Sequence, residues 1–135
     1  MRRATRSTRP DPRQLKRRRL KAYWRGRFAE QLCRWHLRLR GWQILACDWR
    51  CPAGEIDILA RRWGVLAAIE VKSRADFATG AEALLPRQRR RIARAVEAFL
   101  AMRPDLAPLA LRFDVMVVAP LRIPRHLQGA WRSDG

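Results

Sequence analysis

The sequence has few acidic residues and no long apolar run. Its 135 residues include 30 Lys+Arg against 12 Asp+Glu, which gives a formal net charge of +18 at pH 7. A membrane-spanning helix needs about 20 consecutive apolar residues, and no segment here approaches that length, so we expect no membrane segment. The basic N-terminus has no apolar core of the signal-peptide kind, which predicts a cytoplasmic protein. So strong a positive charge attracts polyanions and makes nucleic acid the first partner class to consider.

Cysteine is also scarce. The three cysteines, Cys33, Cys47 and Cys51, are odd in number and contain no C-x-x-C pair, which argues against a disulfide framework or a four-cysteine zinc site. We expect reduced thiols that fill small gaps in the core. A zinc site would require Cys47 and Cys51 to meet His36 or His126, and that spacing matches no zinc-finger pattern.

The positive charge is concentrated at the N-terminus. Residues 1–22 are rich in Arg and poor in apolar side chains, so they bury too little surface to offset the entropy of ordering. We therefore predict a disordered basic tail over residues 1–22 and one folded domain over residues 23–135. The tail is either a phosphate-binding arm or a solvated extension. As an arm, it would contact nucleic acid through Lys16, Arg17, Arg18 and Arg19.

Apolar periodicity predicts the elements of the domain. A first helix over residues 23–39 would bury a face that contains Phe28, Leu32, Trp35 and Leu39, and a second helix would occupy residues 86–102. The expected strands cover residues 42–46, 55–60, 65–71 and 112–118. This order predicts an α/β protein with a mixed sheet flanked by helices.

Two acids interrupt strand patterns that are otherwise apolar. Asp57 and Glu70 are disfavoured in strands, and a charge in a central strand is costly unless it is paired or bound to a metal. If Trp63 and Gly64 form a two-residue turn, Asp57 lies opposite Glu70, and Glu55 lies opposite Lys72. The turn would thus bring two carboxylates and one ammonium group together at one end of a hairpin.

Repelling carboxylates are neutralised well by a hard divalent cation such as Mg²⁺. With a nearby lysine, such a site can polarise a phosphoryl oxygen and steady the charge that develops during phosphodiester hydrolysis. Lys72 fits that role. It is one of three lysines, and the other two lie in the tail. The alternative is a structural cluster of salt bridges that joins Asp57 and Glu55 to Lys72 and Arg74.

Three segments together resemble the YraN-like family of small bacterial proteins: Gly54–Ala60, Ala68–Arg74 and Arg112–Val115. The similarity spans about Arg25 to Trp131. This family is in turn similar to restriction-endonuclease-like nucleases that carry an acid followed by Glu-x-Lys, and especially to archaeal Holliday junction resolvases. The sequence differs from the family pattern at Phe28-Ala29, where a glycine is frequent, and at Arg87, where a lysine usually begins the second helix.

The resemblance implies a restriction-endonuclease-like fold and an endonuclease-like activity. It implies that Asp57, Glu70 and Lys72 are catalytic, that Asp57, Glu70 and Glu30 bind Mg²⁺ or Mn²⁺, and that Glu55 is secondary. The substrate would be DNA rather than RNA, in branched or single-stranded form, and the protein would be a homodimer. On the helical wheel, the apolar face centres near Leu32 and spreads through Ala29 and Cys33 to Leu37. Glu30 lies just beyond Leu37, at the margin of the buried face, where an exposed surface role is equally compatible with its position.

The second helix offers a phosphate-binding surface. Four arginines lie opposite its apolar face, where a solvated helix would more commonly mix acids and lysines. These residues are Arg87, Arg90, Arg91 and Arg94. The leading hypothesis is therefore a Mg²⁺-dependent DNA endonuclease. The second hypothesis is a non-catalytic module of the same fold that binds DNA or RNA. We assign Asp114 a structural role, in a salt bridge to Arg112.

Overall fold

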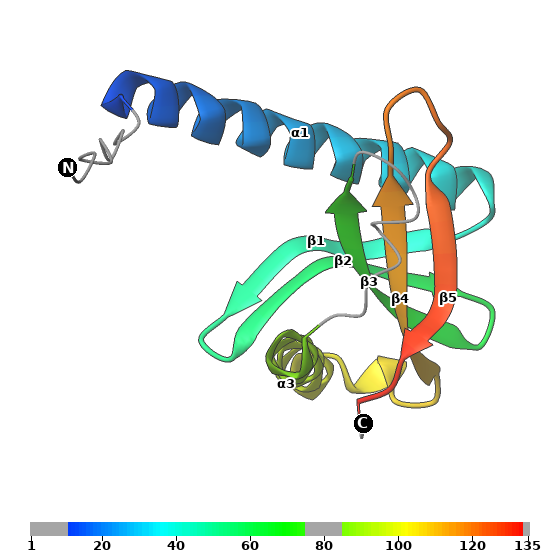
Figure 1. Cartoon of the computed structure of the whole chain (residues 1–135). Coiled ribbons are helices and arrows are strands. Elements are labelled where there is room, and N and C mark those ends of the chain that lie inside the picture. The colour runs from blue at the N-terminus through cyan, green and yellow to red at the C-terminus, as the bar shows by residue number, and fades with distance from the viewer. Residues whose placement is uncertain (1–10, 75–84, 134–135) are drawn as a thin grey trace.

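The protein is an α/β domain built on one five-stranded sheet (Figure 1). The computed structural model describes residues 11–74 and 85–133, and only the backbone for residues 18–25. The strands follow one another in the order β1-β2-β3-β4-β5, and β3 lies in the centre. β3 and β4 run parallel, whereas the other neighbours run antiparallel. These features confirm the predicted mixed sheet flanked by helices.

The chain forms its elements in the predicted order, with one additional strand at the end. The elements are α1 (Pro12–Leu39), β1 (Gln43–Cys51), β2 (Gly54–Arg62), β3 (Val65–Ser73), α3 (Pro86–Met102), a short 3₁₀ helix (Pro104–Leu106), β4 (Ala110–Val118) and β5 (Arg125–Trp131). Within the described part of the chain, neither long helix is apolar enough to cross a membrane.

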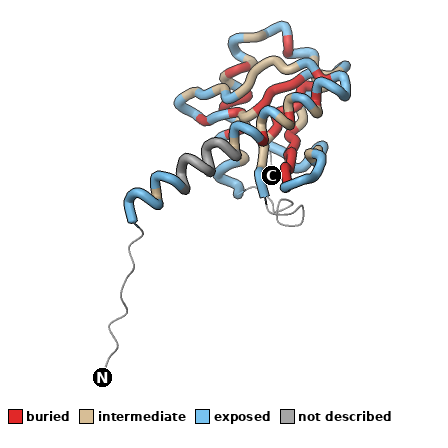
Figure 2. The backbone as a smooth tube through the Cα atoms, turned by 90° about the horizontal axis from the view of Figure 1, so that it is seen from above, coloured by how far each residue is buried: buried red, intermediate tan, exposed pale blue. Residues whose placement is uncertain are grey.

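Helix α1 begins eleven residues earlier than the sequence pattern indicates. We expected a helix from residue 23 and a disordered tail over residues 1–22, but residues 12–22 continue the helix as a basic extension. The Asp11 side chain caps the helix by accepting the Arg13 N–H at 3.0 Å, and Pro12 occupies the first turn. Gln, Lys, Arg and Leu are good helix formers, which favours a helix in this extension. Figure 2 shows the start of α1 projecting beyond the sheet. Residues 1–10 lie outside the described residues.

The two helices cover opposite faces of the sheet (Figure 1). α3 buries Ile92, Val96 and Phe99, as predicted, against one face. α1 covers the other face with the side that the helical wheel predicts. Its buried residues are small or aliphatic, namely Ala29, Cys33 and Leu37, and they pack beside Ile58, Ile69 and Met116.

The residues predicted to form the buried face of α1 are largely exposed. Phe28 is 61% exposed, Trp35 63% and Leu39 83%, while Leu32 is half-buried. Ala29 and Cys33 have small side chains, so α1 can lie close to the strands on that side. The larger side chains, at a similar helical spacing, face away from the sheet. The face that the helical wheel places around Ala29, Cys33 and Leu37 is therefore confirmed. The prediction was wrong in adding Phe28, Trp35 and Leu39 to it.

The predicted hairpin between β2 and β3 is confirmed. The paired residues run from Arg62 and Val65 to Ile58 and Ile69, which is the register expected for a two-residue turn at Trp63 and Gly64. α3 has the predicted bounds. β1 is longer than predicted and continues to Cys51, and β5 was not predicted at all. β5 contains Gly129 at a positive φ of 61°, and its pairing with β4 is irregular, which explains its weak strand pattern.

Asp114 is fully buried, and both of its carboxylate oxygens have hydrogen-bond partners. Its carboxylate accepts two hydrogen bonds from Arg112, at 2.8 and 2.9 Å, and one from the Gly129 N–H at 2.9 Å. His126 Nε2 lies 2.7 Å from the same carboxylate. Burial by itself raises the pKa of Asp114, but these hydrogen bonds outweigh it and lower the pKa. The salt bridge to Arg112 is confirmed within β4. The contacts of Asp114 with His126 and the Gly129 N–H tie the edge strand β5 to β4.

Gly54 allows the β1–β2 hairpin to pack directly on α3. A Cβ atom at this position would lie 2.2 Å from the backbone oxygen of Arg91. Since the helix backbone cannot give way as a flexible side chain can, any larger residue would push the hairpin and α3 apart. This contact sets the position of the strand that carries Glu55 and Asp57.

We predict that Gly54→Ala lowers the free energy of unfolding by about 1–3 kcal/mol, the usual cost of overpacking. Gly64→Ala is the matched control, because a Cβ there would meet no atom within 4 Å. Urea unfolding of both variants measures the difference. Equal stability of the two variants would contradict a close contact between Gly54 and α3.

Candidate metal centre

Three carboxylates from three elements converge beside the central strands. Glu30 of α1, Asp48 of β1 and Asp57 of β2 each place one oxygen so that the three oxygens lie within 4.8 Å of one another. Glu30 and Asp57 are half-buried and Asp48 is exposed, so the cluster opens to solvent on one side. Three carboxylate oxygens at this spacing are ligands of the kind that hard divalent cations prefer.

The register of the β1–β2 hairpin brings Asp48 to Asp57. Cys47 pairs with Ile58 and Trp49 pairs with Ile56, which leaves Asp48 opposite Asp57. Asp48 has a positive φ of 48°, a conformation that Asp adopts more readily than most residues. Its side chain forms a hydrogen bond with that of Glu30.

Asp57 also joins β2 to β3 at the point where their backbone pairing ends. Its Oδ2 accepts the Val71 N–H at 2.9 Å. Its carboxyl group forms a side-chain hydrogen bond with Glu70. Asp57 therefore contacts Glu70 on one side and belongs to the group with Glu30 and Asp48 on the other, so four carboxyl groups from four elements meet around it.

Burial and mutual repulsion raise the pKa values of these acids. Desolvation by burial, together with hydrogen bonding and repulsion from Asp48, raises the pKa of Glu30 to about 8. Burial and the charge of Asp57 raise the pKa of Glu70 to about 8. The pKa of Asp57 is also raised, chiefly by burial, although the Val71 N–H opposes the change. The cluster is therefore more stable with a bound proton or cation than with all of its carboxyl groups ionised and no cation present.

Cationic side chains lie close to the carboxylates. The charge of Lys72 lowers the pKa of Glu70, which opposes the larger effect of burial. The charge of Arg34 acts in the same way on Glu30. Arg27 Nη1 lies 3.8 Å from the Asp48 carboxylate on the exposed side. Lys72 thus approaches the cluster from β3, where the sequence pattern predicted it.

Glu55 is not one of the three converging carboxylates, although its charge raises the pKa values of Asp57 and Glu70. Its carboxylate lies 3.4 Å from Arg50 Nε on the neighbouring strand, and its side chain is 57% exposed. Arg74 instead donates to the Ser73 carbonyl oxygen at 2.9 Å. The alternative salt-bridge cluster of Asp57 and Glu55 with Lys72 and Arg74 is therefore not formed among the described residues.

Sequence reasoning missed Asp48. A two-residue turn at Pro52 and Ala53 pairs Cys51 with Gly54, and the same register places Asp48 opposite Asp57. The hairpin logic that paired Asp57 with Glu70 across the other turn would have found Asp48 as well. It was hidden because the expected strand ended at residue 46.

The cysteines do not form the zinc site that was considered from the sequence. Among the described residues, no group of possible metal ligands combines Cys47 and Cys51 with a histidine. His126 is instead bound to Asp114. Burial raises the pKa of the Cys33 thiol to about 12, so it stays protonated beside the carboxylates.

The arginines of α3 form an exposed basic stripe. All four are solvent-exposed and none forms an ion pair with an acid in the part of the chain that the structure describes. They are Arg87, Arg90, Arg91 and Arg94. Because Gly54 packs on the backbone of Arg91, the stripe belongs to the helix that contacts the hairpin of Asp57. In the α1 extension, Lys16 and Arg17 are exposed, while the side chains of Arg18 and Arg19 lie outside the described residues.

With EDTA present, we predict that the free energy of unfolding falls as the pH rises from about 5 to about 8. Folded Glu30 and Glu70 hold protons in this range because their pKa values are raised from 4.5 to about 8. The unfolded chain releases these protons near pH 4.5, so it binds fewer protons and gains stability relative to the folded state as the pH rises. Urea unfolding at several pH values measures the slope.

Glu70→Gln should flatten that slope, because it removes one of the two titrating groups. Glu97→Gln on the exposed face of α3 is the control and should leave the slope unchanged. A slope that is the same in all three proteins would argue against a strained carboxylate cluster.

Known proteins are similar to this sequence over most of its length. The family described as "Uncharacterised protein family UPF0102" matches residues 29–118, a span that contains Glu30, Asp48, Asp57, Glu70 and Lys72. The UPF0102 protein amb4503 of Paramagnetospirillum magneticum is 50% identical over 114 residues, which cover 82% of this chain and 88% of that protein. A UPF0102 protein of Parvibaculum lavamentivorans is 50% identical over 113 residues, 84% of this chain and 85% of the relative. The YraN-like resemblance is confirmed, and the chain belongs to the UPF0102 family.

Proposed function

We propose that this protein is a metal-dependent endonuclease that hydrolyses phosphodiester bonds in DNA. The observation that carries the proposal is the convergence of Glu30, Asp48 and Asp57, whose oxygens lie within 4.8 Å of one another. Glu70 and Lys72 adjoin the same cluster. A protein that only binds phosphate gains nothing from burying carboxylates beside its ligand, since they repel it.

The donor set fits Mg²⁺ or Mn²⁺. All of the converging groups are carboxylates, and burial and repulsion raise the pKa values of Glu30, Asp57 and Glu70. Asp57, Glu30 and Asp48 would hold the cation, and Glu70 would complete the site through its hydrogen bond to Asp57. When bound, the cation supplies charge neutralisation and Lewis acidity toward a phosphoryl oxygen.

The chain's own residues then orient the substrate and move protons. The Val71 N–H fixes the Asp57 carboxylate, so the site is held by the sheet rather than by a loop. Lys72 places an ammonium group where it can donate a hydrogen bond to a phosphate oxygen or orient the attacking water. The exposed arginines of α3 would bind phosphates of the same DNA.

The substrate class follows from the resemblance and the charge. DNA in branched or single-stranded form is the substrate that the resolvase-like nucleases suggest, and a cytoplasmic setting accords with three reduced cysteines. The second candidate is a non-catalytic DNA- or RNA-binding module of the same fold. The net charge of +18 and the exposed arginine stripe favour it equally well.

The two candidates are separated by a cleavage assay. Purified full-length protein is incubated with labelled duplex, single-stranded and four-way-junction DNA in Mg²⁺, Mn²⁺ or EDTA, with Lys72→Ala alongside. We expect cleavage that requires the metal and is lost in the variant. Tight binding without cleavage in either metal would instead establish the binding module and make the acids structural.

We predict that Asp57→Asn abolishes cleavage while retaining or strengthening DNA affinity, because it removes a ligand and a repulsive charge together. Asp48→Asn should lower the affinity for Mn²⁺ by about tenfold or more. Glu55→Gln is the matched control on the same hairpin, since Glu55 is bound to Arg50. Metal titration calorimetry distinguishes them. A larger loss in Glu55→Gln than in Asp48→Asn would contradict the assigned ligand set.

We further predict that replacing Arg87, Arg90 and Arg94 by Gln lowers the salt dependence of DNA affinity. Each phosphate contact contributes about 0.9 to the slope of log affinity against log salt, so the slope should fall by up to about 3. A control protein with Gln at the exposed positions Arg61, Arg122 and Arg132 loses the same charge outside α3. Slopes that fall equally in both proteins would leave α3 without a specific role.

A further inference from the structure

The outer side of α1 carries an apolar stripe that lies outside the metal centre, and of its four residues only Leu32 packs partly against the core under the helix. Phe28, Leu32, Trp35 and Leu39 recur at intervals of four, three and four residues, which is the spacing of a coiled-coil seam. Phe28 is 61% exposed, Trp35 63% and Leu39 83%. The stripe extends over about 16 Å of helix. Large apolar side chains that are contiguous on a surface mark an interaction site.

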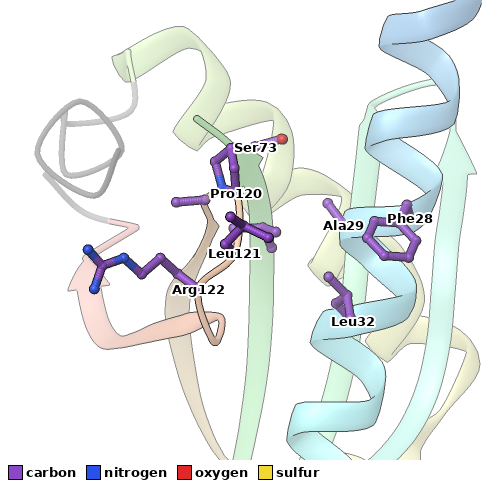
Figure 3. Close-up of a pocket in the computed structure, with 9 residues that line it drawn as sticks. Phe28, Ala29, Leu32, Ser73, Pro120, Leu121 and Arg122 are labelled. Carbon is purple, nitrogen blue, oxygen red and sulfur yellow. The ribbon is translucent and has the colours of Figure 1, made fainter. Parts of the chain in front are cut away.

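A cavity lies beside this stripe. It has a volume of about 400 Å³ and is bounded by Phe28 and Leu32 on one side and by Pro120 and Leu121 on the other (Figure 3). Leu121 is fully exposed and has a positive φ of 57°, a conformation that costs a Leu residue about 1–2 kcal/mol. The turn after β4 thus holds a large apolar side chain in solvent next to an apolar cavity.

The composition of this surface fits a helix better than nucleic acid. Leu32, Leu39 and Leu121 have no aromatic ring on which a base could stack, and heptad spacing complements a second heptad stripe. The surface also contains both an apolar cavity and, beside it, an apolar side chain that could fill such a cavity. A surface that presents both features can bind its own copy across a two-fold axis.

We propose that this stripe is a dimer interface in which α1 packs antiparallel to α1 of a second copy. With the two-fold axis passing between Cys33 and Arg34, Phe28 lies opposite Leu39 of the partner subunit, and Leu32 lies opposite Trp35 of the partner subunit. The apolar residues of the two stripes then match along the contact. The inference does not rest on the proposed nuclease function, because the stripe and the carboxylates are separate groups.

The charges on α1 select the antiparallel direction. A parallel pair would place the two basic extensions side by side, and the exposed Arg13, Lys16 and Arg17 would repel their equivalents. In the antiparallel pair the extensions point away from each other. Beside the stripe, Arg38 then faces the neutral Gln31 of the partner subunit. A net charge of +18 on each copy still opposes association, so salt should strengthen the dimer by screening that repulsion.

The test is sedimentation equilibrium of the full-length protein in EDTA, at low and high salt. We expect a monomer–dimer equilibrium that shifts toward dimer as the salt concentration rises. Trp35→Asp should weaken the dimer by about tenfold or more, as expected for a central interface residue. Met102→Asp is the matched control, because Met102 is 60% exposed at the end of α3, which covers the opposite face of the sheet from α1.

The dimer surface is overturned by either of two results. One is a monomer in both salt conditions at the highest concentration that stays in solution. The other is a dimer that Met102→Asp weakens at least as strongly as Trp35→Asp does. Thermal unfolding of both variants verifies that they remain folded, which we expect because both side chains are exposed. Neither DNA cleavage nor metal binding enters the readout, so failure of the nuclease proposal would not alter it.

Discussion

The repulsion among carboxylates around Asp57 is the constraint on which the site depends. The sheet holds this residue rigidly, since its carboxylate accepts the Val71 N–H where the β2–β3 pairing ends. The β1–β2 hairpin brings Asp48 to it, α1 brings Glu30, and β3 brings Glu70. Folding therefore concentrates like charges that would be farther apart in the unfolded chain. Such an arrangement lowers stability unless protons or a cation occupy it, and it is the kind of compromise found at functional sites.

Asp114 is an acid of the same sheet that has a structural role. It is fully buried, yet Arg112, His126 and the Gly129 N–H satisfy it, and its pKa is lowered. Glu70 is half-buried, but its main neighbour is another carboxyl group, and its pKa is raised to about 8. The two acids are buried in opposite electrostatic settings. This contrast supports a ligand-binding role for one and a structural role for the other.

The sequence predicted the parts of the fold that local pattern determines. The bounds of α3 and the register at the Trp63-Gly64 turn follow from apolar spacing, proline placement and turn geometry. That register is sufficient by itself to predict that Asp57 lies close to Glu70. On α1, the helical wheel placed Ala29, Cys33 and Leu37 in the buried face, but apolar spacing alone could not exclude Phe28 and Trp35 from it. Packing excludes them, because the small side chains of Ala29 and Cys33 permit a closer approach to the sheet. To predict the role of Asp48, one needs the true end of β1, and apolar periodicity placed that end too early.

The two faces of α1 give the helix two separate roles. One side contributes Glu30 to the carboxylate cluster, and the outer side offers an apolar stripe to a second copy. The central claim concerns the first role, and a crystal of the protein soaked in Mn²⁺ tests it most directly. We expect an anomalous scattering peak among the carboxylates of Glu30, Asp48 and Asp57. Well-ordered carboxylates with no peak between them, or a peak only at another acid on the surface, would contradict the metal centre.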